Sequence, residues 1–157
     1  MGKKKKKKKP RIRPLALCVF RRDDKIFVSQ GFDRLKDSTF FRPIGGAIEF
    51  GERGHETIVR EVMEEIKAEV TDIHYLGTLE NIFEHEGNPG HEIVLVYDGR
   101  FVDDKLNDDA IVVRGEDDNV MLFDAMWKPL DFFHEDDTPP LYPDGLLDLL
   151  SGLFLTR

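Results

Sequence analysis

A glycine-rich loop that begins at Gly45 and leads into a helical segment over residues 55–70 constrains the fold more than any other feature. At about 3.6 residues per turn, the apolar side chains of this segment form one arc suited to a core: Ile58, Val59, Val62, Met63, Ile66 and Val70. The i, i+3 and i+4 spacing brings Glu61, Glu64 and Glu65 together, and we place them on the opposite arc. One side of the helix therefore packs on a core while the other presents clustered carboxylates.

Clustered carboxylates repel each other and destabilise a helix, so something must offset their charge. A hard divalent cation such as Mg²⁺ prefers oxygen ligands and is the natural candidate. Glu49 and Glu52 lie in the preceding loop, where Gly46 and Gly51 let the backbone turn sharply and approach a ligand. The alternative is a solvated, glutamate-rich amphipathic helix, which the adjacent glycine-rich loop disfavours.

This segment resembles the signature of the Nudix hydrolases, a glycine followed at fixed distances by a glutamate and an Arg-Glu-apolar-any-Glu-Glu run. The box covers residues 46–68, and seven positions match in register: Gly46, Glu52, Arg60, Glu61, Val62, Glu64 and Glu65. One position departs from the pattern, since Lys67 stands where the family has the glycine that ends the helix. We expect this change to lengthen or redirect the helix end.

The resemblance implies a fold, a reaction and a set of site residues. The implied fold is an α/β/α sandwich with a mixed sheet, and the implied reaction is hydrolysis of a nucleoside diphosphate linked to another group. Mg²⁺ or Mn²⁺ would be bound by Glu61, Glu64 and Glu65, with Glu52 as a direct or water-mediated partner and the Gly46 carbonyl as a further ligand. Arg60 would orient the carboxylates by a salt bridge.

The general base that activates water is not fixed by the box. Glu61 and Glu64 are candidates by position, and the resemblance also admits a carboxylate on a loop outside the box: Glu84, Glu86, Glu92, Glu116 or Asp117. Arg42 is a candidate phosphate contact and Phe83 a candidate for stacking on a base. Trp127 could also stack, but a core position is the more common one for an aromatic residue.

The order of the remaining elements indicates an α+β class. Strands are expected over residues 15–20, 25–30, 40–44, 73–83, 92–102 and 120–127, with a C-terminal helix over residues 144–153. The first two form a hairpin in this interpretation, and residues 103–119 read as an acidic, largely solvated loop. Hairpin turns separate most of the strands, which favours a mixed sheet over a doubly wound parallel one.

Charge divides the chain into two parts. Lys3 to Lys9 form an unbroken run of seven lysines, and without them 16 basic residues face 31 acidic ones, a net charge of -15. We therefore expect a flexible basic arm over residues 1–14 and one Nudix hydrolase domain over residues 15–157. An acidic body disfavours nucleic acid as a partner, because phosphate backbones attract clustered Lys and Arg.

No apolar run is long enough to cross a bilayer, and Cys18 is the single cysteine. We therefore expect a cytoplasmic protein without a membrane partner. Its expected substrate is a nucleotide-type small molecule, and a homodimer is one possible oligomeric state. Two alternatives to this enzyme also stay open. One is a noncatalytic Nudix-fold module that binds a nucleotide, and the other is an RNA 5′-end pyrophosphohydrolase whose lysine arm contacts the polymer.

Overall fold

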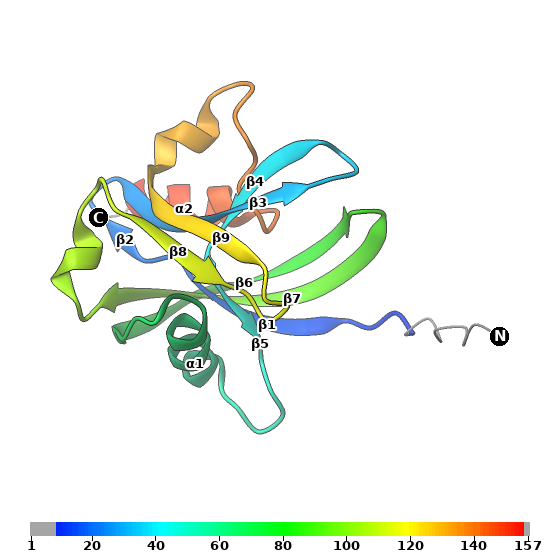
Figure 1. The fold of residues 1–157 in the computed structure, drawn as a ribbon, viewed down its shortest axis with the longest axis horizontal. Helices are drawn as coiled ribbons and strands as arrows, with labels where there is room; N and C mark the ends of the chain where they lie inside the picture. The colour runs from blue at the N-terminus through cyan, green and yellow to red at the C-terminus, as the bar shows by residue number, and fades with distance from the viewer. Residues whose placement is uncertain (1–8, 156–157) are drawn as a thin grey trace.

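The computed structural model describes residues 9–155, so the lysine run predicted as an arm lies almost entirely outside the described residues. Two sheets and two α-helices make up the fold (Figure 1). The first sheet has the order β5-β1-β7-β6, with bounds β1 Arg13–Cys18, β5 Ile44–Ala47, β6 Val70–His85 and β7 Asn88–Phe101. β1 pairs in parallel with β7 and antiparallel with β5, so the predicted mixed sheet is confirmed.

The second sheet is antiparallel and is centred on β3, which pairs with β2, β4 and β9. Its strands are β2 Arg21–Arg22, β3 Lys25–Asp33, β4 Ser38–Arg42, β8 Val112–Glu116 and β9 Leu122–Pro129. The helices are α1 Gly54–Ile66 and α2 Leu146–Leu155, with short 3-10 turns η1 Asp104–Asn107 and η2 Leu130–His134. No helix within residues 9–155 is long and apolar enough to span a membrane.

Alternating side chains of β1 explain why the helices lie on opposite faces of the first sheet (Figure 1). Leu15 and Leu17 join a core cluster that includes Leu146 and Leu150 of α2. Ala16 and Cys18 point the other way and join a cluster that includes Ile58, Val62 and Ile66 of α1. A strand buried on both faces is apolar throughout. The predicted α+β layers are therefore confirmed.

The predicted hairpin of residues 15–20 with 25–30 is confirmed only next to its polar turn, where the Phe27 N–H donates to the Val19 and Phe20 carbonyls. β1 belongs to the first sheet, and β3 instead pairs with the two-residue strand β2. The stretch predicted as a solvated loop over residues 103–119 also contains a strand, β8, which pairs with β9. The pairing of β1 with β7 joins segments that are distant in the sequence, which local patterns do not encode. The β8–β9 pairing is a local hairpin that the acidic composition of the stretch concealed. β1 begins at Arg13, inside the stretch predicted as the arm.

The orientation of α1 corrects the predicted arcs. Val59 and Met63 are 49% and 40% exposed, whereas Glu61 is only 1% exposed. The core-facing arc is therefore rotated toward the carboxylates. This rotation is possible because β5 presents Gly46, which has no side chain, to Glu61.

The end of α1 shows that Lys67 does not lengthen the helix. Lys67 adopts the left-handed conformation (φ 56°, ψ 37°), and its backbone N–H donates to the Met63 carbonyl. Its Nζ also donates to the Glu64 carbonyl at 2.8 Å. The helix thus ends where the family glycine would end it, at the cost of a conformation that residues with a Cβ disfavour. Val70, predicted on the helix, begins β6 instead.

Candidate active site

Arg60 on α1 ties the glycine-rich loop to the helix. Its Nε and Nη2 each donate to Glu52 at 2.8 Å, forming a bidentate ion pair, and Nη2 also donates to the Ala47 carbonyl at 3.0 Å. Thr57 Oγ1 donates to the same carboxylate. These hydrogen bonds, above all those from Arg60, lower the pKa of Glu52 to about 2. Glu52 is therefore ionised and fully engaged in positioning Arg60.

The same guanidinium reaches two carboxylates of the helix. Arg60 Nη1 donates to Glu61 Oε1 at 2.8 Å and to Glu64 Oε2 at 3.3 Å. A planar guanidinium with several donors can hold carboxylates in fixed relative positions. Arg60 thus makes the contacts that an orienting residue requires.

Glu61 is a buried carboxylate with one free oxygen. Its Oε2 is buried and has no hydrogen-bond partner among the described residues. Burial, opposed by the hydrogen bond from Arg60, raises the pKa of Glu61. A Cβ placed on Gly46 would lie 2.5 Å from the Glu61 carboxylate, so only glycine leaves room for it. An unsatisfied buried acceptor beside a glycine indicates a site for a cation or donor.

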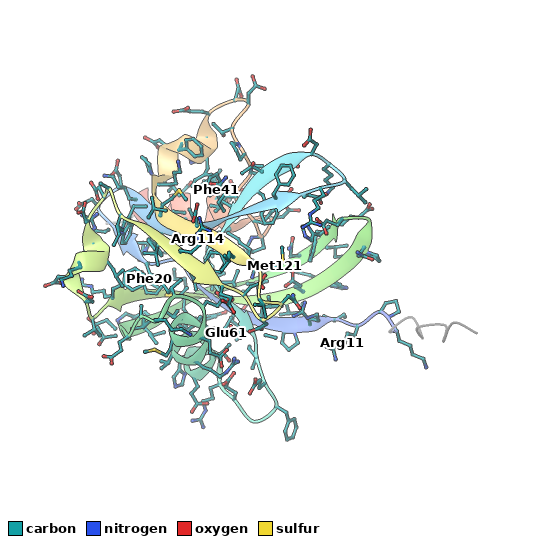
Figure 2. All side chains as sticks on the ribbon, in the orientation of Figure 1. Arg11, Phe20, Phe41, Glu61, Arg114 and Met121 are labelled. Carbon is teal, nitrogen blue, oxygen red and sulfur yellow. The ribbon has the colours of Figure 1, made fainter. Side chains whose placement is uncertain are left out.

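A third carboxylate, that of Asp118, lies close to Glu61 and Glu64 although it is distant from them in the sequence. One oxygen each of Glu61, Glu64 and Asp118 lie within 4.8 Å of one another, and we call this group the carboxylate cluster. Asp118 lies in the turn between β8 and β9, within the segment that the sequence assigned to solvated loop. Figure 2 labels Glu61 on α1 and Met121 at the end of the β8–β9 turn. The sequence offered Asp117 as a candidate, but Asp118 is the residue that joins the cluster.

Glu65, predicted as a metal ligand, lies outside the 4.8 Å cluster but beside it. Its burial raises its pKa to about 8, and the charges of Glu61 and Asp118 add to the increase, while Arg42 opposes it. Hard divalent cations bind sets of carboxylate oxygens. The donor set at this end of α1 fits such an ion, because it combines clustered oxygens, a free acceptor on Glu61 and raised pKa values.

A cleft of about 540 Å³ opens next to these groups. Its walls come from the first sheet, from β4 and from the β8–β9 turn, and it reaches both Gly46 and Glu65. Arg42 and Phe83, the predicted substrate contacts, both line it. Of the loop carboxylates proposed as general base, Glu84, Glu92 and Asp117 line the cleft, whereas Glu86 and Glu116 do not.

Trp127 is part of the core and does not line this cleft. Its ring packs against Phe27 at 5.3 Å between centroids, and its Nε1 donates to the Leu106 carbonyl at 2.7 Å. The indole is 6% exposed. The more common role of an aromatic residue, core packing, therefore holds for Trp127.

The comparison with family models agrees with this geometry. A model of the NUDIX domain matches residues 10–143, which is most of the chain. The chain belongs to the NUDIX domain family. The match includes every box residue that contributes to the ion-pair network and the carboxylate cluster, and it extends to Asp118.

Similar proteins come from several bacteria. The chain is 24% identical over 136 residues to the NAD-capped RNA hydrolase NudC of Pectobacterium carotovorum subsp. carotovorum (strain PC1). That match covers 87% of this chain and 44% of the relative, so the chain spans less than half of the relative's length. Together, the family match and this relative support a Nudix pyrophosphohydrolase.

Solved structures support the fold. A NUDIX hydrolase from Nitrosomonas europaea superimposes with a TM-score of 0.64 at 16% identity, covering 95% of this chain and 91% of the other. A MutT NUDIX hydrolase from Burkholderia pseudomallei gives a TM-score of 0.56 at 19% identity, covering 89% and 97%. At these identities the similarity shows a shared architecture.

Proposed function

We propose that this protein is a divalent-metal-dependent hydrolase that cleaves the pyrophosphate bond of a nucleoside diphosphate linked to another group. The observation that carries the proposal is the free, buried oxygen of Glu61 within the carboxylate cluster. Burying an ionised acceptor without a partner is costly. A bound cation removes that cost, which gives the cluster a purpose that a solvated helix would lack.

Glu61, Glu64 and Asp118 are the residues that would hold Mg²⁺ or Mn²⁺, with Glu65 beside them and Glu52 acting through Arg60 or through water. When bound, such an ion neutralises pyrophosphate oxygens and lowers the pKa of a water ligand. Arg42 lines the cleft next to Glu65 and supplies a positive charge for a phosphate. The positive charges of a bound ion and of Arg42 would allow this acidic protein to bind an acidic substrate.

Proton transfer is assigned to Glu64 in this proposal. Glu61 is held by Arg60 and is 1% exposed, whereas the side chain of Glu64 is 49% exposed and can reach solvent. A general base must lie within hydrogen-bonding distance of the water whose proton it accepts. Glu64 is better suited than Glu61 to reach such a water, because its side chain is more exposed, and Arg60 limits its motion.

The test is a panel of nucleotide sugars, dinucleoside polyphosphates and other nucleoside diphosphate derivatives with Mg²⁺. We expect the wild type to hydrolyse at least one of them, Glu64→Gln to lose on the order of 10²–10⁴-fold in rate, and the matched surface variant Glu69→Gln to keep full activity. The absence of hydrolysis across the panel would favour the noncatalytic nucleotide-binding module instead.

A second candidate function is hydrolysis at a capped RNA 5′ end, which the name of the Pectobacterium relative favours. In that case the lysine run would contact the polymer. Deletion of residues 1–10 decides between the two. Under this second function the deletion weakens RNA binding and slows turnover of capped RNA, while hydrolysis of small nucleotide substrates is unchanged. Unchanged RNA affinity together with unchanged turnover of capped RNA after the deletion rules it out.

A further inference from the structure

A second carboxylate, mostly buried and without a hydrogen bond among the described residues, lines the cleft. Glu92 on β7 is 9% exposed and lines the cleft together with Asn81 of β6, which is 5% exposed. The two residues are direct partners across the strands in the antiparallel register. Side chains that are paired in this way lie on the same face of a sheet, with Cβ atoms about 5 Å apart.

Neither residue uses its full hydrogen-bonding capacity within residues 9–155. The Glu92 carboxylate accepts no hydrogen bond and forms no ion pair within 4.0 Å, although the charges of Arg42 and Arg13 are near enough to oppose the rise that burial causes in its pKa. Asn81 Oδ1 accepts the backbone N–H of Asp144 at 3.3 Å, which leaves the amide nitrogen to the cleft. Because both residues line the cleft, these free groups are available to a molecule bound there.

The free groups form an ordered pattern. Two carboxylate oxygens are acceptors and the neighbouring amide nitrogen is a donor. The complementary edge carries two adjacent N–H donors followed by a carbonyl, which is the Watson–Crick edge of guanine: the amino group, N1–H and O6. Adenine presents one amino donor beside an acceptor nitrogen, and cytosine and uracil likewise lack two adjacent donors, so none of them matches all three groups.

The surroundings suit a planar base. Phe83 follows Asn81 by two residues on β6 and lines the same cleft. Phe40 and Tyr142, whose rings lie 5.5 Å apart between centroids, line the cleft as well. Aromatic walls with a few well-placed polar groups are typical of sites for small molecules.

We propose that Asn81 and Glu92 read the base of the substrate and select guanine nucleotides. The inference deepens the proposed function, since it names the base of the nucleotide that the same cleft would accept. It concerns binding alone, however, and it can be tested without hydrolysis.

The experiment measures the affinities of GMP, AMP, UMP and CMP by calorimetric titration. These monophosphates have no anhydride bond, so the result does not depend on catalysis. We expect the wild type to bind GMP about tenfold to a hundredfold more tightly than the others, because two hydrogen bonds to a charged group are at stake. Glu92→Gln replaces one acceptor with a donor, which should remove most of the preference for GMP over AMP. Glu80→Gln, on β6 beside Asn81 with its side chain 64% exposed, should leave the ratio unchanged.

Asn81→Asp provides an independent variant, because it keeps the acceptor for the Asp144 N–H but places an acceptor against O6. It should lower GMP affinity by a similar factor even if Glu92→Gln fails to fold. Equal affinity of the wild type for all four nucleotides, binding of none, or an unchanged GMP to AMP ratio in both variants would overturn the role of this pair. Metal-dependent hydrolysis alongside any of these results would leave the proposed function standing.

Discussion

Two cavities of similar size lie in different parts of the molecule, and they differ in how their charges are satisfied. The cleft beside the carboxylate cluster has a volume of about 540 Å³, and a far cavity of about 490 Å³ is lined by Phe20, Arg21, Arg22, Arg100 and Trp127, among others. In the far cavity, Arg21 pairs with Asp98 at 2.6 Å, and Arg22 pairs with Asp109 while lying over the Trp127 ring. One nitrogen of Arg22 is buried without a partner, but its charge is balanced.

At the cleft and the carboxylate cluster beside it, by contrast, acids outnumber the bases that pair with them. Arg60 is shared among Glu52, Glu61 and Glu64, and Glu61 still keeps a free oxygen. Glu92, which lines the cleft, accepts no hydrogen bond within the described part of the chain. The two cavities therefore differ little in volume but clearly in how well their buried charges are balanced. Variants that alter one of these two regions, or neither, test whether hydrolysis depends on the uncompensated charge.

The largest effect is expected for Glu61→Gln. The substitution removes the buried charge of the carboxylate cluster while preserving shape, and we expect hydrolysis to fall on the order of 10²–10⁴-fold. Asp109→Asn, which removes the ion-pair partner of Arg22 at the far cavity, is the control and should keep the wild-type rate. An equal loss of activity in the two variants would contradict the claim that hydrolysis depends on the carboxylate cluster and not on the far cavity.

Gly46→Ala should have the next largest effect. The added Cβ would lie 2.5 Å from the Glu61 carboxylate and displace it. Misplacing a catalytic group by about 1 Å costs on the order of a hundredfold in rate. Gly152→Ala on α2 is the control, because no atom lies within 4 Å of its Cβ position. Steady-state rates at saturating Mg²⁺ measure both, and full activity of Gly46→Ala would show that Glu61 does not need its observed position.

The pH dependence of stability should report Glu65. Its pKa is about 8 in the folded protein against an ordinary value of 4.5, so the folded state binds more protons than the unfolded state between these values. The free energy of unfolding of the metal-free protein should therefore decrease as pH rises from about 4.5 to 8, by at most about 5 kcal/mol. Urea unfolding at several pH values measures this. Glu65→Gln should flatten the profile, and an equally steep profile in that variant would assign the effect to another group.

The smallest effect is expected at Lys67, which belongs to neither cavity. Lys67→Gly relieves the left-handed conformation and should raise the free energy of unfolding by about 1 kcal/mol, less what is lost with the Nζ bond to Glu64. Lys67→Ala keeps the strain and loses that bond, so it should be destabilising. Thermal unfolding distinguishes the two variants, and hydrolysis should be unchanged in both.

The sequence predicts what is local. The box residues follow one another on a loop and a helix, so their spacing alone brings Glu61 and Glu64 together beside Arg60. The parallel pairing of β1 with β7 and the arrival of Asp118 from the β8–β9 turn depend on contacts between distant segments, which spacing does not reveal.

Two further errors have a specific physical cause. The burial of Glu61 in place of Val59 depends on Gly46 of a neighbouring strand, so the helix pattern alone gave the wrong arc. The helix ends at Ile66 without a glycine because Lys67 tolerates the left-handed conformation and its side chain bonds to a terminal carbonyl. In both cases the sequence identified the residue and the surroundings determined its role.

The most direct test of the account is binding of Mn²⁺, followed by electron paramagnetic resonance in the absence of substrate. We expect the wild type and Asp109→Asn to bind the ion equally, and Glu61→Gln and Asp118→Asn each to bind it at least about tenfold more weakly, since each loses a charged ligand. Equal Mn²⁺ affinity in Glu61→Gln and the wild type would contradict the claim that uncompensated carboxylates make this cleft a metal site.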